Sequence, residues 1–225
     1  MYRRTLVTAV PACLAAAAGA LQAQQARPAF DAKEYWDKNH RESRSLARPE
    51  PNAFLMAMVK GHKPGKALDV GMGPGRNAIW LARQGWDVTG FDISGVAVDA
   101  ALEAAKAAGV KINAFIKDLK DWDYGTAQWD LVLLCYMQGD ARFRSRQVID
   151  SLRPGGIVII ETWHQDLDRE TGRKVGGFET NEVFKLYGSL RIRHYEDTLA
   201  EPDWGKELGG KPRPVVRIMA QKMAS

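Results

Sequence analysis

One stretch of the chain, residues 67–77 (ALDVGMGPGRN), restricts the possible folds more than any other. Three glycines at every second position follow a short apolar run, and a helical pattern begins directly behind them. A strand, a glycine-rich turn and a helix in this order let a ligand approach the backbone closely and present the amides of a helix N-terminus to it. The stretch therefore predicts a nucleotide-binding loop in an α/β fold.

The sequence around this loop alternates between strand and helix patterns. Strands are expected at 67–70, 87–91, 111–116, 129–135 and 157–161, with helices at 77–84, 96–108, 142–152 and 180–187. Strands that are apolar throughout and alternate with helices indicate a parallel sheet covered on both faces. Two further strands, 190–198 and 214–222, have no helix between them and should pair antiparallel. The predicted fold class is α/β: a doubly wound, mostly parallel seven-stranded sheet with an antiparallel C-terminal strand pair.

Residues 1–23 have the pattern of a secretory signal peptide. Arg3 and Arg4 precede an apolar run, and small residues stand at the expected cleavage site after Ala23. The mature protein is therefore expected to be periplasmic or secreted, with no membrane contact after signal cleavage. The alternatives are an uncleaved membrane anchor and an incorrectly assigned start codon. The protein would be cytoplasmic if the segment does not serve export.

The remainder is expected to form a linker with an N-terminal helix, residues 24–51, and one domain, residues 52–225. Without the signal segment the chain carries 30 basic and 27 acidic residues, a balance too even to favour nucleic acid. Cys135 is then the only cysteine, so no internal disulfide is expected. No metal site is predicted, and the sequence leaves the oligomeric state open. Four histidines stand without ligand spacing: His40, His62, His164 and His194.

Two nucleotide-binding patterns fit the glycine loop. The dinucleotide fingerprint Gly-x-Gly-x-x-Ala begins at Gly73, and Asp92 stands at the distance expected of an acid that holds a ribose. The acidic-x-Gly-x-Gly-x-Gly loop of methyltransferases is matched equally well by Asp69 with Gly71, Gly73 and Gly75. The loop alone does not separate a dehydrogenase from a methyltransferase.

Three features outside the loop favour the second pattern. Only residues 162–225 follow the fifth strand, and they complete the same sheet rather than form the substrate domain that a nicotinamide enzyme generally needs. Asp118 and Leu119 follow the third strand, where an acidic side chain can accept a hydrogen bond from an adenine amino group. The third feature is the turn at 152–156 (LRPGG) before the fifth strand, a turn that is found repeatedly in one family.

With these motifs the sequence resembles the class I, Rossmann-like, S-adenosylmethionine-dependent methyltransferases over residues 54–222. The stretch GPGRNAIWLARQGWDVTGFDIS is most similar to the small-molecule methyltransferases related to the tellurite-resistance and thiol or thiopurine enzymes. The resemblance implies S-adenosylmethionine as cofactor and a small-molecule acceptor, with thiols and other soft nucleophiles among the candidates. An exported, non-catalytic module that binds the same cofactor, and an NAD-dependent dehydrogenase, are the alternatives.

The resemblance also assigns roles to residues. The glycines would bring backbone against the methionine part of the cofactor, and Asp69 would attract its ammonium group. Asp92 would accept the ribose hydroxyls, Asp118 would bind the adenine edge, and Cys135 would contribute backbone near the sulfonium. The full set of implied cofactor-binding residues is Asp69, Gly71, Gly73, Gly75, Asp92, Ile93, Asp118, Leu119 and Cys135.

The catalytic candidates are Tyr136 and His164, at the carboxyl ends of the fourth and fifth predicted strands. His164 is the candidate general base, because an unperturbed imidazole titrates near neutral pH. The Asn/Asp-Pro-Pro-aromatic tetrapeptide of enzymes that act on nucleic-acid bases is absent, since residues 135–138 read CYMQ. A small acceptor is therefore favoured over DNA. Arg76, behind the loop, faces either the substrate or solvent.

Overall fold

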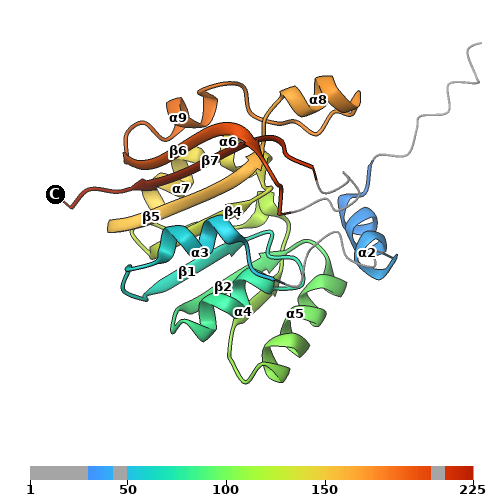
Figure 1. The fold of residues 1–225 in the computed structure, drawn as a ribbon. Helices are drawn as coiled ribbons and strands as arrows, with labels where there is room; N and C mark the ends of the chain where they lie inside the picture. Colours follow the sequence, from blue (N-terminus) through green and yellow to red (C-terminus); the bar gives the residue numbers. More distant parts are fainter. Residues whose placement is uncertain (1–29, 43–49, 204–210, 225) are drawn as a thin grey trace, which may run out of the picture. The chain divides into compact units, whose positions relative to one another are not determined.

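The computed structural model describes residues 30–42, 50–203 and 211–224 (Figure 1). The chain divides into two units, Met1–Asp31 and Ala32–Ser225, and the elements described below belong to the second. The signal-peptide prediction falls on residues outside the described ranges. The predicted domain boundaries stay predictions.

The second unit is built on a seven-stranded sheet with the order β3-β2-β1-β4-β5-β7-β6. β1 to β5 run parallel, whereas β7 pairs antiparallel with both β5 and β6. The predicted fold class is confirmed. The strands are β1 (Lys66–Val70), β2 (Asp87–Asp92), β3 (Asn113–Ile116), β4 (Trp129–Cys135), β5 (Leu152–Trp163), β6 (Arg191–Ala200) and β7 (Arg213–Gln221).

Helices cover both faces of this sheet (Figure 1). One face packs against α3 (Ala53–Val59), α4 (Arg76–Arg83) and α5 (Gly95–Ala107). The other packs against α6 (Gln138–Phe143), α7 (Ser145–Ser151) and α9 (Glu182–Leu186). The remaining helical elements are α2 (Ala32–Glu42), α8 (Asp166–Thr171) and the 3₁₀ helix η1 (Leu119–Asp121). No helix in the described part of the chain is long and apolar enough to cross a membrane.

The alternating direction of strand side chains explains the two cores. In β4, Leu131 and Leu133 join the α3–α5 core, while Val132 and Leu134 join the core under α6, α7 and α9. All four side chains are fully buried. A strand buried on both faces must be apolar throughout, which is why the sequence pattern identified these strands well.

The structure differs from the sequence prediction in the segment after β4. The single helix expected at 142–152 is two short helices, because the backbone leaves helical geometry at Arg144, which ends α6 and precedes α7. Arg144 pairs with Asp140, whose carboxylate also accepts a hydrogen bond from the Tyr124 hydroxyl. The Tyr124 contact comes from another part of the chain, so the helical pattern alone does not reveal it. α8, which ends before a left-handed Gly172, was not predicted.

Gly75 connects the loop to α4 in a conformation that other residues rarely adopt. Its φ is +80°, and a Cβ at this position would lie 2.8 Å from the Cβ of Ala101 in α5. Gly109 has a similar φ of +70°, but a Cβ added to Gly109 would have no other atom within 4 Å.

We expect Gly75→Ala to lower the free energy of unfolding by about 3 kcal/mol, because it adds a steric clash to the backbone strain. Gly109→Ala should lower it by about 1 kcal/mol, since only the strain is present. Urea unfolding of both variants measures the difference. Equal losses would show that the close approach of α4 to α5 does not constrain Gly75.

Candidate active site

The carboxyl ends of the parallel strands bring the predicted residues together. Asp69 and Asp92 stand near the ends of β1 and β2, and Cys135 ends β4. In an open parallel sheet, ligands bind at this edge, where the strand order reverses. Here the order reverses between β1 and β4, which places the glycine loop at that point.

The glycine loop has the conformation that its sequence requires. Gly71, Gly73 and Gly75 have φ values of +62°, +54° and +80°. A side chain at Gly71 would run into the sulfur of Met137, which packs against this glycine from the end of β4. The loop is therefore a backbone surface that any ligand at this edge of the sheet contacts directly.

Asp92 fixes the loop from the neighbouring strand. Its Oδ2 accepts a hydrogen bond from the amide of Gly73 at 3.0 Å, and its Oδ1 accepts one from the amide of Ser94 at 2.9 Å. Burial raises the pKa of this carboxyl, and the amides oppose the rise. A carboxylate that joins β2 to the loop in this way lies where the resemblance expects the ribose acid.

Asp69 is the most unusual group in the site. The residue is 2% exposed, and its Oδ2 has no hydrogen-bond partner among the described residues. Burial raises its pKa to about 7, and the nearby charge of Arg76 only partly opposes this rise. A buried carboxyl oxygen without a partner is costly, so it is best satisfied by a ligand that supplies a positive donor. The side chain therefore fits the cofactor ammonium that the resemblance implies.

The adenine-side residues lie farther along the same edge. Asp118 precedes η1, where its Oδ1 accepts a hydrogen bond from the amide of Lys120 at 3.0 Å. This hydrogen bond, together with the ammonium of Lys120, lowers the pKa of Asp118. Leu119 is partly buried against the core, and Trp122 stacks on Phe91 with ring centroids 4.2 Å apart. The roles of Asp118, Leu119 and Ile93 toward adenine stay predictions.

Sequence reasoning considered Tyr35 and Trp36 of α2 either as a lid over the cofactor or as packing residues, and it missed the contacts of Asp37 and His40. The buried carboxylate of Asp37 accepts a hydrogen bond from the Ser94 hydroxyl at 2.6 Å and so holds α2 against the start of α5. One turn later, Cε1 of His40 lies 3.8 Å from the position of a Cβ on Gly73. The spacing of Asp37 and His40 puts both on one helix face, but the sequence does not show what that face contacts.

On the acceptor side, Tyr136 adopts a strained conformation directly after β4. Its φ is +57°, which is rare for a residue with a bulky side chain. The hydroxyl donates a hydrogen bond to Oε1 of Glu161 at 2.7 Å and accepts one from the amide of Asp203 at 3.0 Å. Burial and the charge of Glu161 raise the pKa of Tyr136 well above its usual value. The hydroxyl is therefore a hydrogen-bond donor rather than a base.

Glu161 is a second residue that sequence reasoning missed. It is fully buried in β5, and its Oε1 also accepts a hydrogen bond from the side-chain amide of Asn52 at 3.0 Å. Its Oε2 lies 2.8 Å from Nε of Arg217 in β7. Asn52 in turn caps α3 and binds the side chain of Asn77 in α4. The only sequence signal was a charged residue inside each of two apolar strands.

His164 directly follows β5 and has both ring nitrogens engaged. Nδ1 accepts a hydrogen bond from the amide of Asp166 at 3.1 Å, and Nε2 lies 3.1 Å from the hydroxyl of Thr180. The residue is 6% exposed. These contacts fix the ring and connect β5 to the segment before α9. A role as general base stays a prediction.

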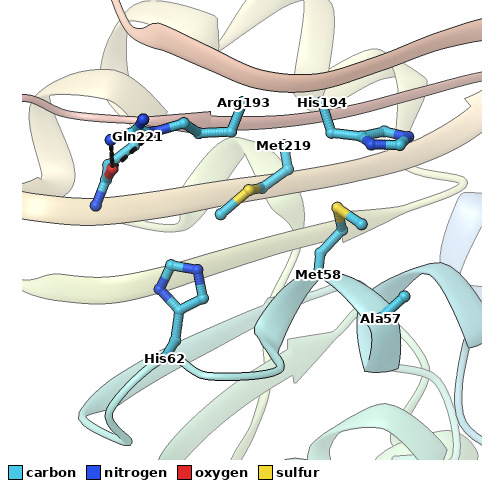
Figure 2. A pocket seen from close by; sticks show the side chains of 7 residues that line it. All are labelled: Ala57, Met58, His62, Arg193, His194, Met219 and Gln221. Carbon is cyan, nitrogen blue, oxygen red and sulfur yellow. Dashed lines mark hydrogen bonds between the residues drawn. The ribbon is translucent and has the colours of Figure 1, made fainter.

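A separate open hollow of about 420 Å³ lies away from this edge, between α3 and the β6–β7 pair (Figure 2). The hollow reaches the end of the sheet where the parallel strands begin. Its lining residue Gln221 pairs there with Ile157, at the beginning of the apolar part of β5. Figure 2 shows Arg193 hydrogen-bonded to Gln221, at 3.0 and 2.7 Å. The lining contains none of the predicted site residues: Ala57, Met58, His62, Arg193, His194, Met219 and Gln221.

The strand order, the glycine loop and the acids after β1 and β2 are together those of the class I, Rossmann-like methyltransferase fold. Residues 67–156 match the family model Methyltransf_25, described as a methyltransferase domain. The resemblance drawn from the motifs is thereby confirmed.

Known proteins agree with this assignment. TehB from Haemophilus influenzae superimposes with a TM-score of 0.65 at 18% identity, covering 84% of this chain and 66% of that one. A protein from Methanosarcina mazei described as an SAM-dependent methyltransferase superimposes with a TM-score of 0.62 at 19% identity, covering 78% and 100%. In sequence, the ribosomal RNA small subunit methyltransferase C of Alcanivorax borkumensis is 43% identical over 120 residues, which are 48% of this chain and 36% of that protein. The chain thus spans about a third of the length of this relative.

The buried ion pair at Glu161 leads to a stability prediction. We expect Arg217→Met to lower the free energy of unfolding by about 3 kcal/mol, because a fully buried carboxylate loses its counter-charge. Adding Glu161→Gln should recover part of the loss, since no charge then stays buried. Arg153→Met is the control, because its pair with Asp130 is 41% and 32% exposed and should contribute under about 1 kcal/mol. Similar losses in both single variants, measured by urea unfolding, would contradict the prediction.

The raised pKa of Asp69 predicts a pH dependence of stability. The carboxyl titrates near 3.8 in the unfolded chain and near 7 in the folded protein, so the folded state holds an extra proton between these values. The free energy of unfolding should therefore fall as the pH rises from about 4 to about 7, by at most about 1.4 kcal/mol per pH unit. Asp69→Asn should lack this contribution. Urea unfolding of both proteins across the range gives the difference, and a difference independent of pH would refute it.

Proposed function

We propose that the protein is an S-adenosylmethionine-dependent methyltransferase that acts on a small-molecule nucleophile. One observation carries the proposal: a buried carboxylate oxygen of Asp69 lacks a partner among the described residues, directly beside a loop of three glycines with positive φ. This arrangement suits a ligand that has both a positive group and an extended chain. The methyltransferase matches support the assignment, and they do not favour the non-catalytic module or the dehydrogenase.

The residues at the sheet edge would bind the cofactor in one orientation. Asp69 would bind the ammonium of its methionine end, and Asp92 would bind its ribose while holding the loop through Gly73. Asp118, which precedes η1 after β3, would meet the adenine, and Cys135 would line the region of the sulfonium. When bound, the cofactor supplies an activated methyl group.

Catalysis on such a donor rests mainly on alignment and on the exclusion of water. Tyr136 is suited to alignment, because Glu161 fixes its hydroxyl and burial keeps it protonated. A soft nucleophile such as a thiolate needs no further base. A harder acceptor would need one, and His164 is the candidate, although its ring nitrogens are both engaged in this structure.

The acceptor class is proposed from sequence features. A near-even charge balance and the sequence CYMQ at residues 135–138 favour a small molecule over DNA. Ribosomal RNA is the second candidate acceptor, because the Alcanivorax borkumensis relative is named for that substrate.

We further propose export to the periplasm or the medium, on the signal-peptide pattern of residues 1–23. Fusion of residues 1–30 to a reporter that is active only outside the cytosol tests this. A silent reporter would contradict export and would leave the proposed chemistry unaffected.

Calorimetry tests the cofactor assignment. S-adenosylhomocysteine should bind with a dissociation constant below about 1 mM, which corresponds to roughly 4 kcal/mol, and NAD should not compete. We expect Asp92→Asn to weaken this binding at least about tenfold, because hydrogen bonds from the ribose to a charged acceptor are lost. Asp87→Asn is the matched control, since it removes the same charge from the exposed opposite end of β2. If neither S-adenosylmethionine nor S-adenosylhomocysteine binds, the methyltransferase proposal is refuted.

Turnover separates the acceptor classes. The protein and labelled S-adenosylmethionine are incubated with small thiols, halides, oxyanions of selenium or tellurium, and ribosomal RNA. Methyl transfer to a small compound supports the proposal, whereas transfer to RNA alone would replace it with the second candidate. Cofactor binding without transfer to any acceptor would favour the binding module.

A further inference from the structure

An ion pair joins the start of α4 to the connection between β6 and β7. Arg76 is the first residue of α4, directly behind the glycine loop, and its Nη1 lies 2.8 Å from Oδ2 of Asp203. The two side chains are 11% and 12% exposed. Asp203 belongs to the connection between β6 and β7, so a segment distant in sequence lies against the loop.

The contact between these two side chains is one of charge alone. Nη1 of Arg76 directs its hydrogen bond to the carbonyl of Glu50 at 2.9 Å, and Oδ2 of Asp203 accepts no well-directed hydrogen bond in the described structure. An optimal arginine–carboxylate pair is bidentate, with two parallel hydrogen bonds. The guanidinium is therefore placed to bind a carboxylate, and Asp203 fits it poorly.

Arg76 lies within electrostatic range of Asp69. Its charge is the main influence that opposes the raised pKa of the Asp69 carboxyl, and both residues also act on Cys135 at the end of β4. The site thus presents a carboxylate oxygen without a partner and a guanidinium with a poorly matched one. An α-amino acid group, with one ammonium and one carboxylate, is complementary to this pair of charges.

We propose that Arg76 binds the carboxylate of the amino-acid end of the cofactor, and that Asp203 competes for the same guanidinium. The inference rests on the proposed function and adds a competition built into the chain. Binding of the cofactor then displaces Asp203, and with it the backbone amide that Asp203 donates to the Tyr136 hydroxyl.

The competition has a measurable size. If the pair is formed in most molecules, the apparent affinity for the cofactor is reduced by the fraction in which Arg76 is available. Asp203→Asn keeps the shape of the side chain and removes its charge. This variant should bind S-adenosylmethionine about three- to tenfold more tightly than the wild type.

Decarboxylated S-adenosylmethionine isolates the contact, because it keeps the ammonium and the sulfonium and lacks the carboxylate. Its affinity should change less than about twofold in Asp203→Asn. Arg76→Gln should weaken the binding of S-adenosylmethionine at least about tenfold. It should change the affinity for the decarboxylated compound by less than about twofold. Asp150→Asn is the charge-matched control, because Asp150 pairs with Arg146 on α7 where both side chains are well exposed. Thermal unfolding confirms that each variant is folded.

The outcomes separate this proposal from the function on which it rests. Unchanged or weaker binding of S-adenosylmethionine by Asp203→Asn would overturn the competition while leaving the methyltransferase assignment intact. Equal gains in affinity for S-adenosylmethionine and its decarboxylated form would also overturn it, because a general charge effect would then explain both gains. If the wild type and the variants bind neither ligand, both proposals fail.

One further measurement distinguishes the source of the carboxylate. Malonate is titrated into the wild type and Asp203→Asn, each saturated with S-adenosylhomocysteine. The proposal expects no binding that depends on Asp203, because the cofactor already occupies Arg76. Malonate binding that strengthens in Asp203→Asn and disappears in Arg76→Gln would assign Arg76 to the acceptor and overturn the cofactor assignment.

Discussion

The buried carboxylate of Glu161 is the interaction on which the site depends. It binds the Tyr136 hydroxyl, the Asn52 side chain and the Arg217 guanidinium, which come from the end of β4, the start of α3 and the middle of β7. A charge in a fully buried position is tolerated only when such partners surround it. The same contacts therefore hold the two parts of the sheet, parallel and antiparallel, in one position relative to the acceptor side.

The region around Asp69 and Arg76 follows a different principle. There the described residues leave one carboxylate oxygen of Asp69 without a hydrogen-bond partner, and the ion pair of Arg76 with Asp203 lacks a well-directed hydrogen bond. If both charged groups had well-directed partners within the protein, the fold would be more stable. A ligand would then gain little binding free energy from these groups. In the proposal made above, a zwitterionic ligand would satisfy both groups at once, and its binding would raise the stability of the folded protein.

The sequence predicted most of the fold and the conformation of the glycine loop, because both depend on local patterns. Apolar strands and the loop from Asp69 to Gly75 can be recognised within a few residues, whereas the cofactor contacts of these residues stay predictions. The Glu161 network, the position of α2 over the loop and the contact of Asp203 with Arg76 could not be predicted in this way. Each joins residues far apart in the chain, and their partners become visible only when the strand order is known.

The position of β7 has a consequence for the order of folding. β7 is the last of the described strands in sequence, and yet it lies inside the sheet, between β5 and β6. Until β7 is inserted, β5 has an open edge and Glu161 lacks its counter-charge from Arg217. A chain still emerging from the ribosome can therefore form the glycine loop and its neighbouring strands before β7 has been made. The buried network around Glu161 forms only after β7 has been synthesised and has entered the sheet.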